Sequence, residues 1–379
     1  MFSILKIRGF AAYLLIAFLN AFTDLGHKII IQNTIFKFYD GTTQVVLTAL
    51  VNACIVLPFV LFFTPTGFLA DKFPKERIIQ VAAACAIPLT AVITLAYYMG
   101  WFELAFAMTL LLGIQAAFYS PAKYGYIKEL AGKENIAGAN AFVQAITIIS
   151  ILGGTVAFSA LFEAYIAPDA ASIHALLQSI APLGWLLVVF SIVEFLFTLR
   201  LPHKHDTNTE LRFDVKKYVR FGYLRQNLGG VRSSEVIWLS IIGISVFWGV
   251  NQVVLAAFPA YLKETLHVHN TTISNGLMGV GGLGIIIGSF IAGKASEEFI
   301  ETGVVPLGAL GITVSLFILP GVHSLWWLAA LFLFYGVMGG LFLIPLNALV
   351  QFNAGSDEAG TVLAANNFMQ NLLMSLFLV

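Results

Sequence analysis

Residues 139–144 read Ala139-Asn140-Ala141-Phe142-Val143-Gln144, and residues 365–370 read Ala365-Asn366-Asn367-Phe368-Met369-Gln370. Two further pairs recur in the same order at nearly the same separation: Tyr119-Ser120-Pro121-Ala122-Lys123 with Leu343-Ile344-Pro345-Leu346-Asn347, and Phe68-Leu69-Ala70-Asp71-Lys72 with Phe290-Ile291-Ala292-Gly293-Lys294. Single Phe or Ala matches are common in apolar sequence, but three matches in one order indicate an internal repeat. We therefore predict two similar halves arranged in parallel.

The composition around this repeat is that of a membrane protein. Hydrophobic residues make up 59% of the chain and charged residues only 11%, whereas soluble domains have about 25% charged residues. The mean hydropathy is +0.88. A soluble protein of this size has too little interior to bury so much apolar surface, so the composition excludes a soluble enzyme. The formal net charge of zero gives no reason to expect a nucleic-acid partner.

Runs of about 20 apolar residues, the length needed to cross a bilayer, predict an all-α membrane protein with eleven spans. The expected spans cover residues 10–36, 43–69, 78–99, 104–127, 137–162, 180–199, 236–262, 272–292, 304–319, 325–350 and 360–379. A polar segment divides them, which predicts a six-helix half at 1–200, a basic linker at 201–235 and a five-span half at 236–379. A full transporter should have a twelfth span, and this sequence contains none after residue 379. We therefore expect that the chain is a truncated or partial form.

The basic residues predict the orientation. With the N-terminus in the cytoplasm, 16 of the 20 Lys and Arg residues fall on the cytoplasmic side, as the positive-inside rule requires. Eight of them lie from Arg200 to Arg232. We interpret this segment as a solvated linker; the alternative is an amphipathic helix on anionic headgroups, with Phe213, Tyr218, Phe221 and Tyr223 as its apolar contacts.

Residues 67–77 read Gly67-Phe68-Leu69-Ala70-Asp71-Lys72-Phe73-Pro74-Lys75-Glu76-Arg77. This resembles the signature G-x-L-A-D-[RK]-x-G-R-[RK] of the major facilitator superfamily, although Pro74 replaces the second glycine and Arg77 comes late. The resemblance implies a substrate site near the midplane between the two halves. It also implies that Asp71, Lys72 and Arg77 form a latch on the cytoplasmic side; a plain cytoplasmic turn of mixed charge is the alternative.

Polar and charged residues inside apolar spans are costly in a bilayer and are candidates for function. Asp24 and Lys28 are four residues apart on one helix face, so we expect them to pair; a purely structural pair is the alternative. Lys123 either points into a cavity or snorkels to the interface. Glu103, Glu163 and Glu194 lie near span ends, and we interpret them as interfacial. The candidate substrate-binding residues are Asn20, Asp24, His27, Lys28, Tyr119, Lys123, Asn251, Gln252 and Asn347.

The chain shows no motif of catalysis or of cofactor binding. It has no G-x-x-x-x-G-K-[ST] loop, so ATP-driven pumping by this chain is not expected. The glycine-rich run Gly279–Gly288 lies inside an expected span, where small residues allow close helix packing. The loop histidines are not expected to bind metal. We therefore predict a protein that is not an enzyme, with no catalytic residues, no cofactor and no metal.

Residues 117–130 read Ala117-Phe118-Tyr119-Ser120-Pro121-Ala122-Lys123-Tyr124-Gly125-Tyr126-Ile127-Lys128-Glu129-Leu130, followed by Ala139-Asn140. This is similar to the Y-S-P-A-K-Y-G…E-L…A-N signature of the bacterial lysophospholipid transporters, and Phe18–Asp24 is similar to their F-L-x-A-F-x-D. The resemblance implies movement of lysophosphatidylethanolamine-like lipids to the cytoplasmic leaflet of the bacterial inner membrane for re-acylation. It implies as partners membrane lipids and a fused or associated acyltransferase and acyl-carrier-protein synthetase.

A one-tailed phospholipid suits these residues. Lys123 would bind the phosphate and Asp24 the ammonium, while the acyl tail needs an apolar cavity. His27 and Lys28 depart from the apolar residues expected in this family. Two alternatives stay open: a proton-coupled drug or metabolite antiporter with Asp24 as proton carrier, and a non-transporting membrane module of a fused acyltransferase. An antiporter would normally carry an intramembrane Arg in the fourth span, which this chain lacks.

Overall fold

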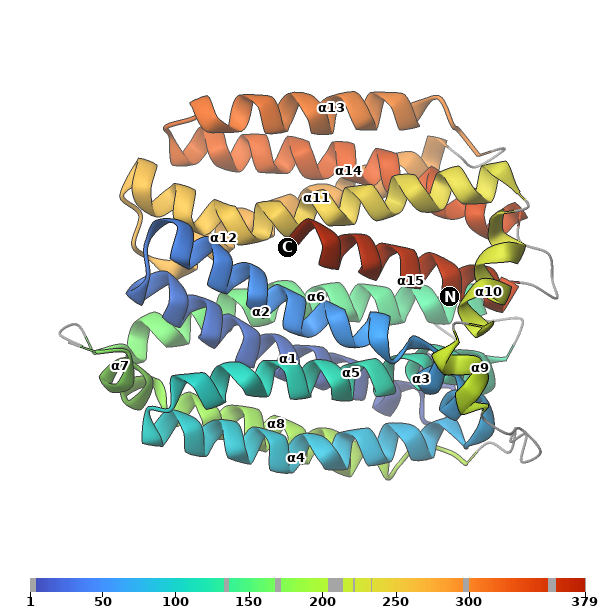
Figure 1. Ribbon diagram of the computed structural model, residues 1–379, viewed down its shortest axis with the longest axis horizontal. Helices are drawn as coiled ribbons and strands as arrows, with labels where there is room; N and C mark the ends of the chain where they lie inside the picture. The colour runs from blue at the N-terminus through green and yellow to red at the C-terminus, as the bar shows by residue number, and fades with distance from the viewer. Residues whose placement is uncertain are drawn as a thin grey trace. The chain divides into compact units, whose positions relative to one another are not determined.

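The computed structural model describes residues 5–132, 136–167, 172–203, 214–220, 222–232, 234–295, 300–353 and 359–378. Within these residues the chain is helical, without a β-strand (Figure 1). The helices are α1 (Phe10–Phe38), α2 (Gly41–Leu61), α3 (Phe63–Lys72), α4 (Lys75–Met99), α5 (Phe102–Ala131), α6 (Ile136–Tyr165), α7 (Ile173–Ile180), α8 (Pro182–Thr198), α9 (Val215–Val219), α10 (Gly222–Arg232), α11 (Glu235–Leu266), α12 (Thr271–Ala295), α13 (Val304–Ile318), α14 (Leu325–Asn353) and α15 (Ala359–Leu378).

Among the described residues, eight helices are long and apolar enough to cross a membrane, or nine if the bent pair α7 and α8 is one span. The eight are α1, α2, α4, α5, α11, α12, α13 and α14. The fifth and eleventh predicted spans form helices α6 and α15, as expected. Neither helix is both long enough and apolar enough to count as a membrane span by the same criterion. In α6 the apolar part is Ile149–Tyr165. α15 contains four amide side chains, which lower its hydropathy. The chain is therefore a multi-pass membrane protein.

Proline lies at a break in the second predicted span and at the start of the helix that forms the sixth. The second span is broken at Phe62 into α2 and α3, and Pro65, in the first turn of α3, lacks the backbone N–H that would continue the hydrogen bonding of α2. The sixth predicted span, residues 180–199, corresponds to α8, and α7 precedes it and meets it at an angle of 49°. Pro182 begins α8, a position where a proline fits a helix start without losing a hydrogen bond.

Contacts between Cα atoms divide the chain into two compact units, residues 1–39 with 57–214, and residues 40–56 with 215–379. In the first unit, α1 packs against α6 and α8, and α4 packs against α5 and α8. An aromatic core at one end of this bundle contains Phe10, Tyr13, Tyr119 and Tyr126, each no more than 2% exposed. These contacts place α1 in the interior of the first unit, so its polar residues are enclosed by its neighbours.

In the second unit, α12 and α14 are packed tightly together through glycines, and α14 also contacts α13 and α11. A Cβ atom added at Gly284 would collide with the Leu333 carbonyl, and one at Gly288 with the Val337 carbonyl. On α14, a Cβ at Gly336 or Gly340 would meet the backbone of α12. This confirms that the glycine-rich run of α12 serves close helix packing.

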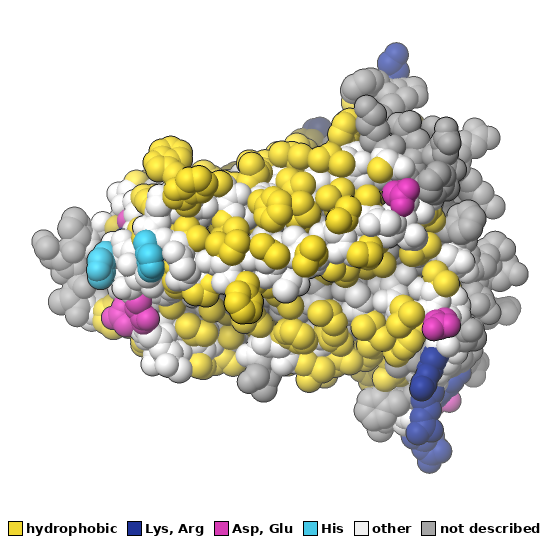
Figure 2. All heavy atoms as spheres, turned by 90° about the horizontal axis from the view of Figure 1, so that it is seen from above, with side chains coloured by type: hydrophobic (Ala, Val, Ile, Leu, Met, Phe, Trp, Pro, Cys, Tyr) yellow, Lys and Arg dark blue, Asp and Glu magenta, His cyan; other side chains and the backbone are white. Residues whose placement is uncertain are grey.

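The outer surface matches a bilayer. Figure 2 shows hydrophobic side chains over the middle of one face and charged side chains toward its two ends. Phe317, Trp326 and Trp327 are each more than two thirds exposed, as expected for side chains in contact with lipid tails and headgroups. Ion pairs lie at helix ends, with Lys37 Nζ at 2.9 Å from Glu163 Oε2 and Lys263 Nζ at 2.7 Å from Asp40 Oδ1.

The described part of the predicted linker forms two short helices, α9 and α10. α10 packs against α15 and α11, and Val231 near its end is fully buried. The Lys217 ammonium lies 4.5 Å from the centre of the Tyr223 ring. Phe213 and Phe221 lie outside the described residues, so the hypothesis of a headgroup-binding helix stays a prediction.

Candidate functional site

Lys123 lies in the interior of the first unit. Its side chain, on α5, is 6% exposed, and its ammonium Nζ is 3.4 Å from Thr147 Oγ1 on α6. The backbone carbonyl of Lys123 accepts a hydrogen bond of 2.6 Å from the Tyr13 hydroxyl on α1. A snorkelling lysine would expose its ammonium to water, so this burial argues against the interfacial alternative.

Asp24 faces the charge of Lys123 on α5 rather than that of Lys28. Asp24 is within electrostatic range of Lys123, whereas none of the ion pairs found among the described residues involves Asp24 or Lys28. The expected pair four residues apart on α1 is therefore wrong. Both side chains are half-buried. The ammonium of Lys123 on α5 interacts with Asp24, whereas no such interaction links Asp24 to Lys28 on its own helix.

Glu194 is a buried member of the site that the sequence did not reveal. We expected it at the membrane interface because it lies near a span end, but on α8 it is 1% exposed. Its carboxylate lies within electrostatic range of both Asp24 and Lys123. The Asn20 amide approaches it, yet neither carboxylate oxygen has a hydrogen-bond partner. The interfacial assignment is corrected, because the packing of α8 against α1 turns this face inward.

Tyr119 completes a group of five side chains that we call the acid–lysine cluster. Its ring is 2% exposed and its hydroxyl is buried without a hydrogen-bond partner, within electrostatic range of Glu194 and Asp24. The cluster consists of Asn20, Asp24, Tyr119, Lys123 and Glu194, contributed by α1, α5 and α8. Buried polar atoms without partners are rare in folded proteins, so their presence here makes the cluster a candidate binding site.

His27 is a packing residue and not part of the cluster. It is fully buried, and its Nδ1 lies 2.7 Å from the Tyr97 hydroxyl on α4. Its Nε2 lies 3.1 Å from the Ala105 carbonyl and 3.2 Å from Thr109 Oγ1 on α5. A carbonyl only accepts, so Nε2 carries the hydrogen and Nδ1 accepts from Tyr97. Since both ring nitrogens are occupied, the predicted substrate contact through His27 is not supported.

The candidates of the second unit bond mainly within their own helices. The Asn251 amide donates to the Phe247 carbonyl at 3.2 Å, and the Asn347 amide donates to the Leu343 carbonyl at 3.0 Å. Gln252 Nε2 lies 3.3 Å from Met374 Sδ on α15, while Gln252 Oε1 is buried without a partner. These three side chains are half-buried, and their role in binding stays a prediction.

The predicted latch residues lie at the α3–α4 junction. The side chain of Asp71 lies outside the described part of the structure. Lys72 ends α3, with its ammonium 5.7 Å and 5.8 Å from the ring centres of Phe68 and Phe73, and Arg77 is exposed in the first turn of α4. Nearby, Lys75 forms an ion pair with Glu129, which joins α4 to α5.

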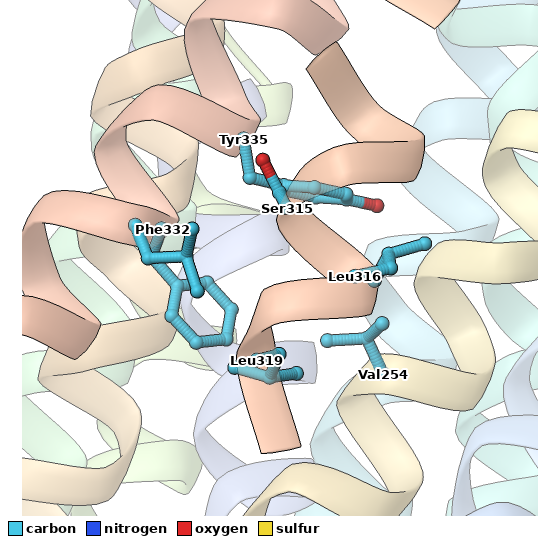
Figure 3. A pocket seen from close by; sticks show the side chains of 7 residues that line it. Val254, Ser315, Leu316, Leu319, Phe332 and Tyr335 are labelled. Atoms are coloured by element: carbon cyan, nitrogen blue, oxygen red, sulfur yellow. The ribbon is translucent and has the colours of Figure 1, made fainter. Parts of the chain in front are cut away.

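The second unit has a small pocket between α11, α13 and α14, lined by Val254, Ser315, Leu316, Leu319, Phe332 and Tyr335 (Figure 3). Its volume is about 10 Å³, which is barely enough for one water molecule. It is too small for a substrate. Among the described residues there is no group of three or more His, Cys, Asp or Glu side chains that could hold a metal ion.

Comparison with known proteins agrees with this architecture. The lysophospholipid transporter LplT of Photorhabdus laumondii is 29% identical over 98% of this chain and 87% of its own length. LplT of Serratia proteamaculans is 28% identical over the same shares. A bacterial homolog of the human lysosomal transporter Spinster, in an inward-facing, unoccupied conformation, has a similar fold, with a TM-score of 0.68 and 13% identity over 97% of this chain and 80% of that one.

The family model that describes the Major Facilitator Superfamily matches residues 7–378, nearly the whole chain. The match includes both halves of the internal repeat and every helix of the structure. The chain belongs to the Major Facilitator Superfamily.

Proposed function

We propose that this chain transports lysophospholipids of the lysophosphatidylethanolamine type across a bacterial inner membrane, toward the cytoplasmic leaflet, where an acyltransferase re-acylates them. The observation that carries the proposal is the acid–lysine cluster, which places two carboxylates and an ammonium inside apolar helices. The relatives named lysophospholipid transporter LplT support the substrate class.

The chemistry of the cluster suits this substrate. A lysophosphatidylethanolamine headgroup carries one phosphate and one ammonium, so it needs a cation and an anion within a few ångströms of each other. Lys123 supplies a compact positive charge for the phosphate, and Asp24 supplies a carboxylate for the ammonium. The single acyl chain requires apolar surroundings, which the surrounding spans provide. Alternating access would carry this site from one side of the membrane to the other.

Burial of Glu194 favours a second candidate function, proton-coupled antiport. A buried carboxylate without a hydrogen-bond partner can bind a proton from one side of the membrane and release it to the other. In this function the transported molecule would be a drug or metabolite, and lysolipid movement would be absent.

The test is leaflet-resolved uptake in vesicles that contain the purified protein. Radiolabelled lysophosphatidylethanolamine is added outside, and albumin then extracts what remains in the outer leaflet. We expect time-dependent protection from albumin with the wild type, reduced about tenfold in Lys123→Met, because a lost charge-assisted contact costs about 1.5 kcal/mol or more. Lys216→Met, in an exposed residue of α9, is the control and should transport normally.

Two outcomes would count against the proposal. Protection equal to that in protein-free vesicles would exclude lysolipid transport. Normal uptake by Lys123→Met would remove the cluster from the site. Uptake of a cationic drug driven by an imposed proton gradient, without lysolipid uptake, would support the antiport function instead.

A further inference from the structure

Beyond the substrate class, we propose that Glu194 sets a preference for zwitterionic over anionic lysophospholipids; this inference rests on the proposed function. Glu194 belongs to the cluster, is 1% exposed and has two carboxylate oxygens without hydrogen-bond partners. A buried carboxylate in this condition is stabilised by a further cation, because a single ammonium does not offset the desolvation of two carboxylates.

One cation is shared by the two carboxylates of the cluster. Lys123 is the cation within electrostatic range of the Glu194 carboxylate, and it also faces Asp24. Tyr119 faces Glu194 as well but contributes no positive charge. Two carboxylates around one ammonium leave the cluster with a net charge of minus one when all three groups are ionised. The ammonium of a lysolipid headgroup would neutralise it.

Lys123 is the cation for the phosphate of the headgroup, as in the proposed function. A zwitterionic headgroup brings no net charge into the cluster. An anionic lysolipid, such as lysophosphatidylglycerol, would bring a second net negative charge into a region of low dielectric constant, which is costly.

The experiment compares two substrates in vesicles with the full chain. Uptake of lysophosphatidylethanolamine and lysophosphatidylglycerol is measured for the wild type and for Glu194→Gln, which keeps the size of the side chain and removes one negative charge. The wild type should prefer the zwitterionic lipid. In Glu194→Gln the ratio of the two uptake rates should shift by about tenfold toward the anionic lipid, because the charged groups that remain, Asp24 and Lys123, carry no net negative charge.

Two further variants separate selectivity from stability. Glu194→Asp keeps the charge and should keep the wild-type preference. Ser191→Ala changes a buried residue one turn earlier on α8, whose hydroxyl donates to the Leu187 carbonyl at 2.9 Å, and should leave the ratio unchanged. Thermal unfolding in detergent shows whether each variant folds, and the ratio is independent of the amount of folded protein in the vesicles.

The outcomes are distinct. If the wild type moves neither lipid, the proposed function fails. If the wild type moves both and Glu194→Gln leaves their ratio unchanged, Glu194 does not sense the headgroup and this inference is overturned. Equal loss of both uptakes in Glu194→Gln, together with loss of their response to a proton gradient, would identify a proton carrier and would also overturn it.

Discussion

Lys123 is the residue on which the electrostatics of the cluster depend. Its ammonium lies within electrostatic range of both Asp24 and Glu194, and its side chain contacts α6 through Thr147. Removing one member of a buried charged group leaves the others uncompensated, which usually costs more than removing the whole group. Asp24 and Lys123 should therefore behave as one energetic unit.

A double-mutant cycle tests this coupling. Asp24→Asn and Lys123→Met are made singly and together, and the free energy of unfolding in detergent is measured for each. We expect the double variant to be more stable than the sum of the two single effects by about 1 kcal/mol or more. The matched cycle of Asp24→Asn with Lys28→Met should be additive within about 0.5 kcal/mol. Additivity in the first cycle and coupling in the second would restore the pair along α1.

At the scale of helices, glycine decides how closely α12 and α14 approach. At Gly288 an added Cβ would lie 2.8 Å from the Val337 carbonyl carbon and 2.9 Å from its Cα, so no side chain fits there without moving a backbone. In a bilayer, where apolar lipid replaces water, such close backbone contact is a main source of helix association. Gly276 lies on the same helix, but an added Cβ there would have no atom within 4 Å.

The two glycines make a matched pair of substitutions. Gly288→Ala should lower the free energy of unfolding by about 1–3 kcal/mol, the usual cost of overpacking. Gly276→Ala should be neutral or stabilising by up to about 1 kcal/mol, because alanine favours a helix more than glycine does. Thermal unfolding of the purified variants in detergent measures both. Equal effects at the two positions would mean that helix propensity, not the contact with α14, determines the result.

At the scale of the whole molecule, transport by this fold requires the two halves to open alternately to each side. The signature around Asp71 recurs in weaker form near Lys294 in the second half, where the acidic residue is replaced by Gly293. This asymmetry makes Asp71 the candidate for a latch that stabilises the outward-open state. The latch role of Asp71 is a prediction from the sequence, and accessibility labelling of the membrane-embedded transporter tests it.

Asp71→Asn removes the charge and should shift the population toward inward-open states. Cysteines introduced along the transport path and labelled from each side of the membrane report the two populations. We expect cytoplasmic labelling to increase and labelling from the outside to decrease, each about threefold or more, which corresponds to about 0.7 kcal/mol. Arg232→Gln, in an exposed residue of α10, should leave the labelling unchanged. Identical labelling in Asp71→Asn and the wild type would exclude the latch.

Composition and residue order are enough to predict the class of this protein. Three features can be read from composition and residue order. They are the apolar runs of bilayer length, the repeat of residues 139–144 at 365–370, and the basic residues between the halves. Membrane spans are predictable because each must satisfy its own backbone hydrogen bonds in a helix. The same logic identified Lys123 and Asp24, since an ionised side chain within an apolar run is conspicuous in the sequence alone.

Which side chains meet in the site depends on how the helices pack. Spacing along α1 suggested that Asp24 pairs with Lys28, but the packing of α5 and α8 against α1 brought Lys123 and Glu194 to Asp24 instead. Glu194 appeared interfacial because position along a span does not reveal which face of its helix is buried. His27 appeared available because its partners, Tyr97 and Ala105, lie about 70 to 80 residues away. Charges at membrane depth are compensated by side chains on neighbouring helices. The positions of those helices depend on packing throughout the bundle, which short sequence patterns do not predict.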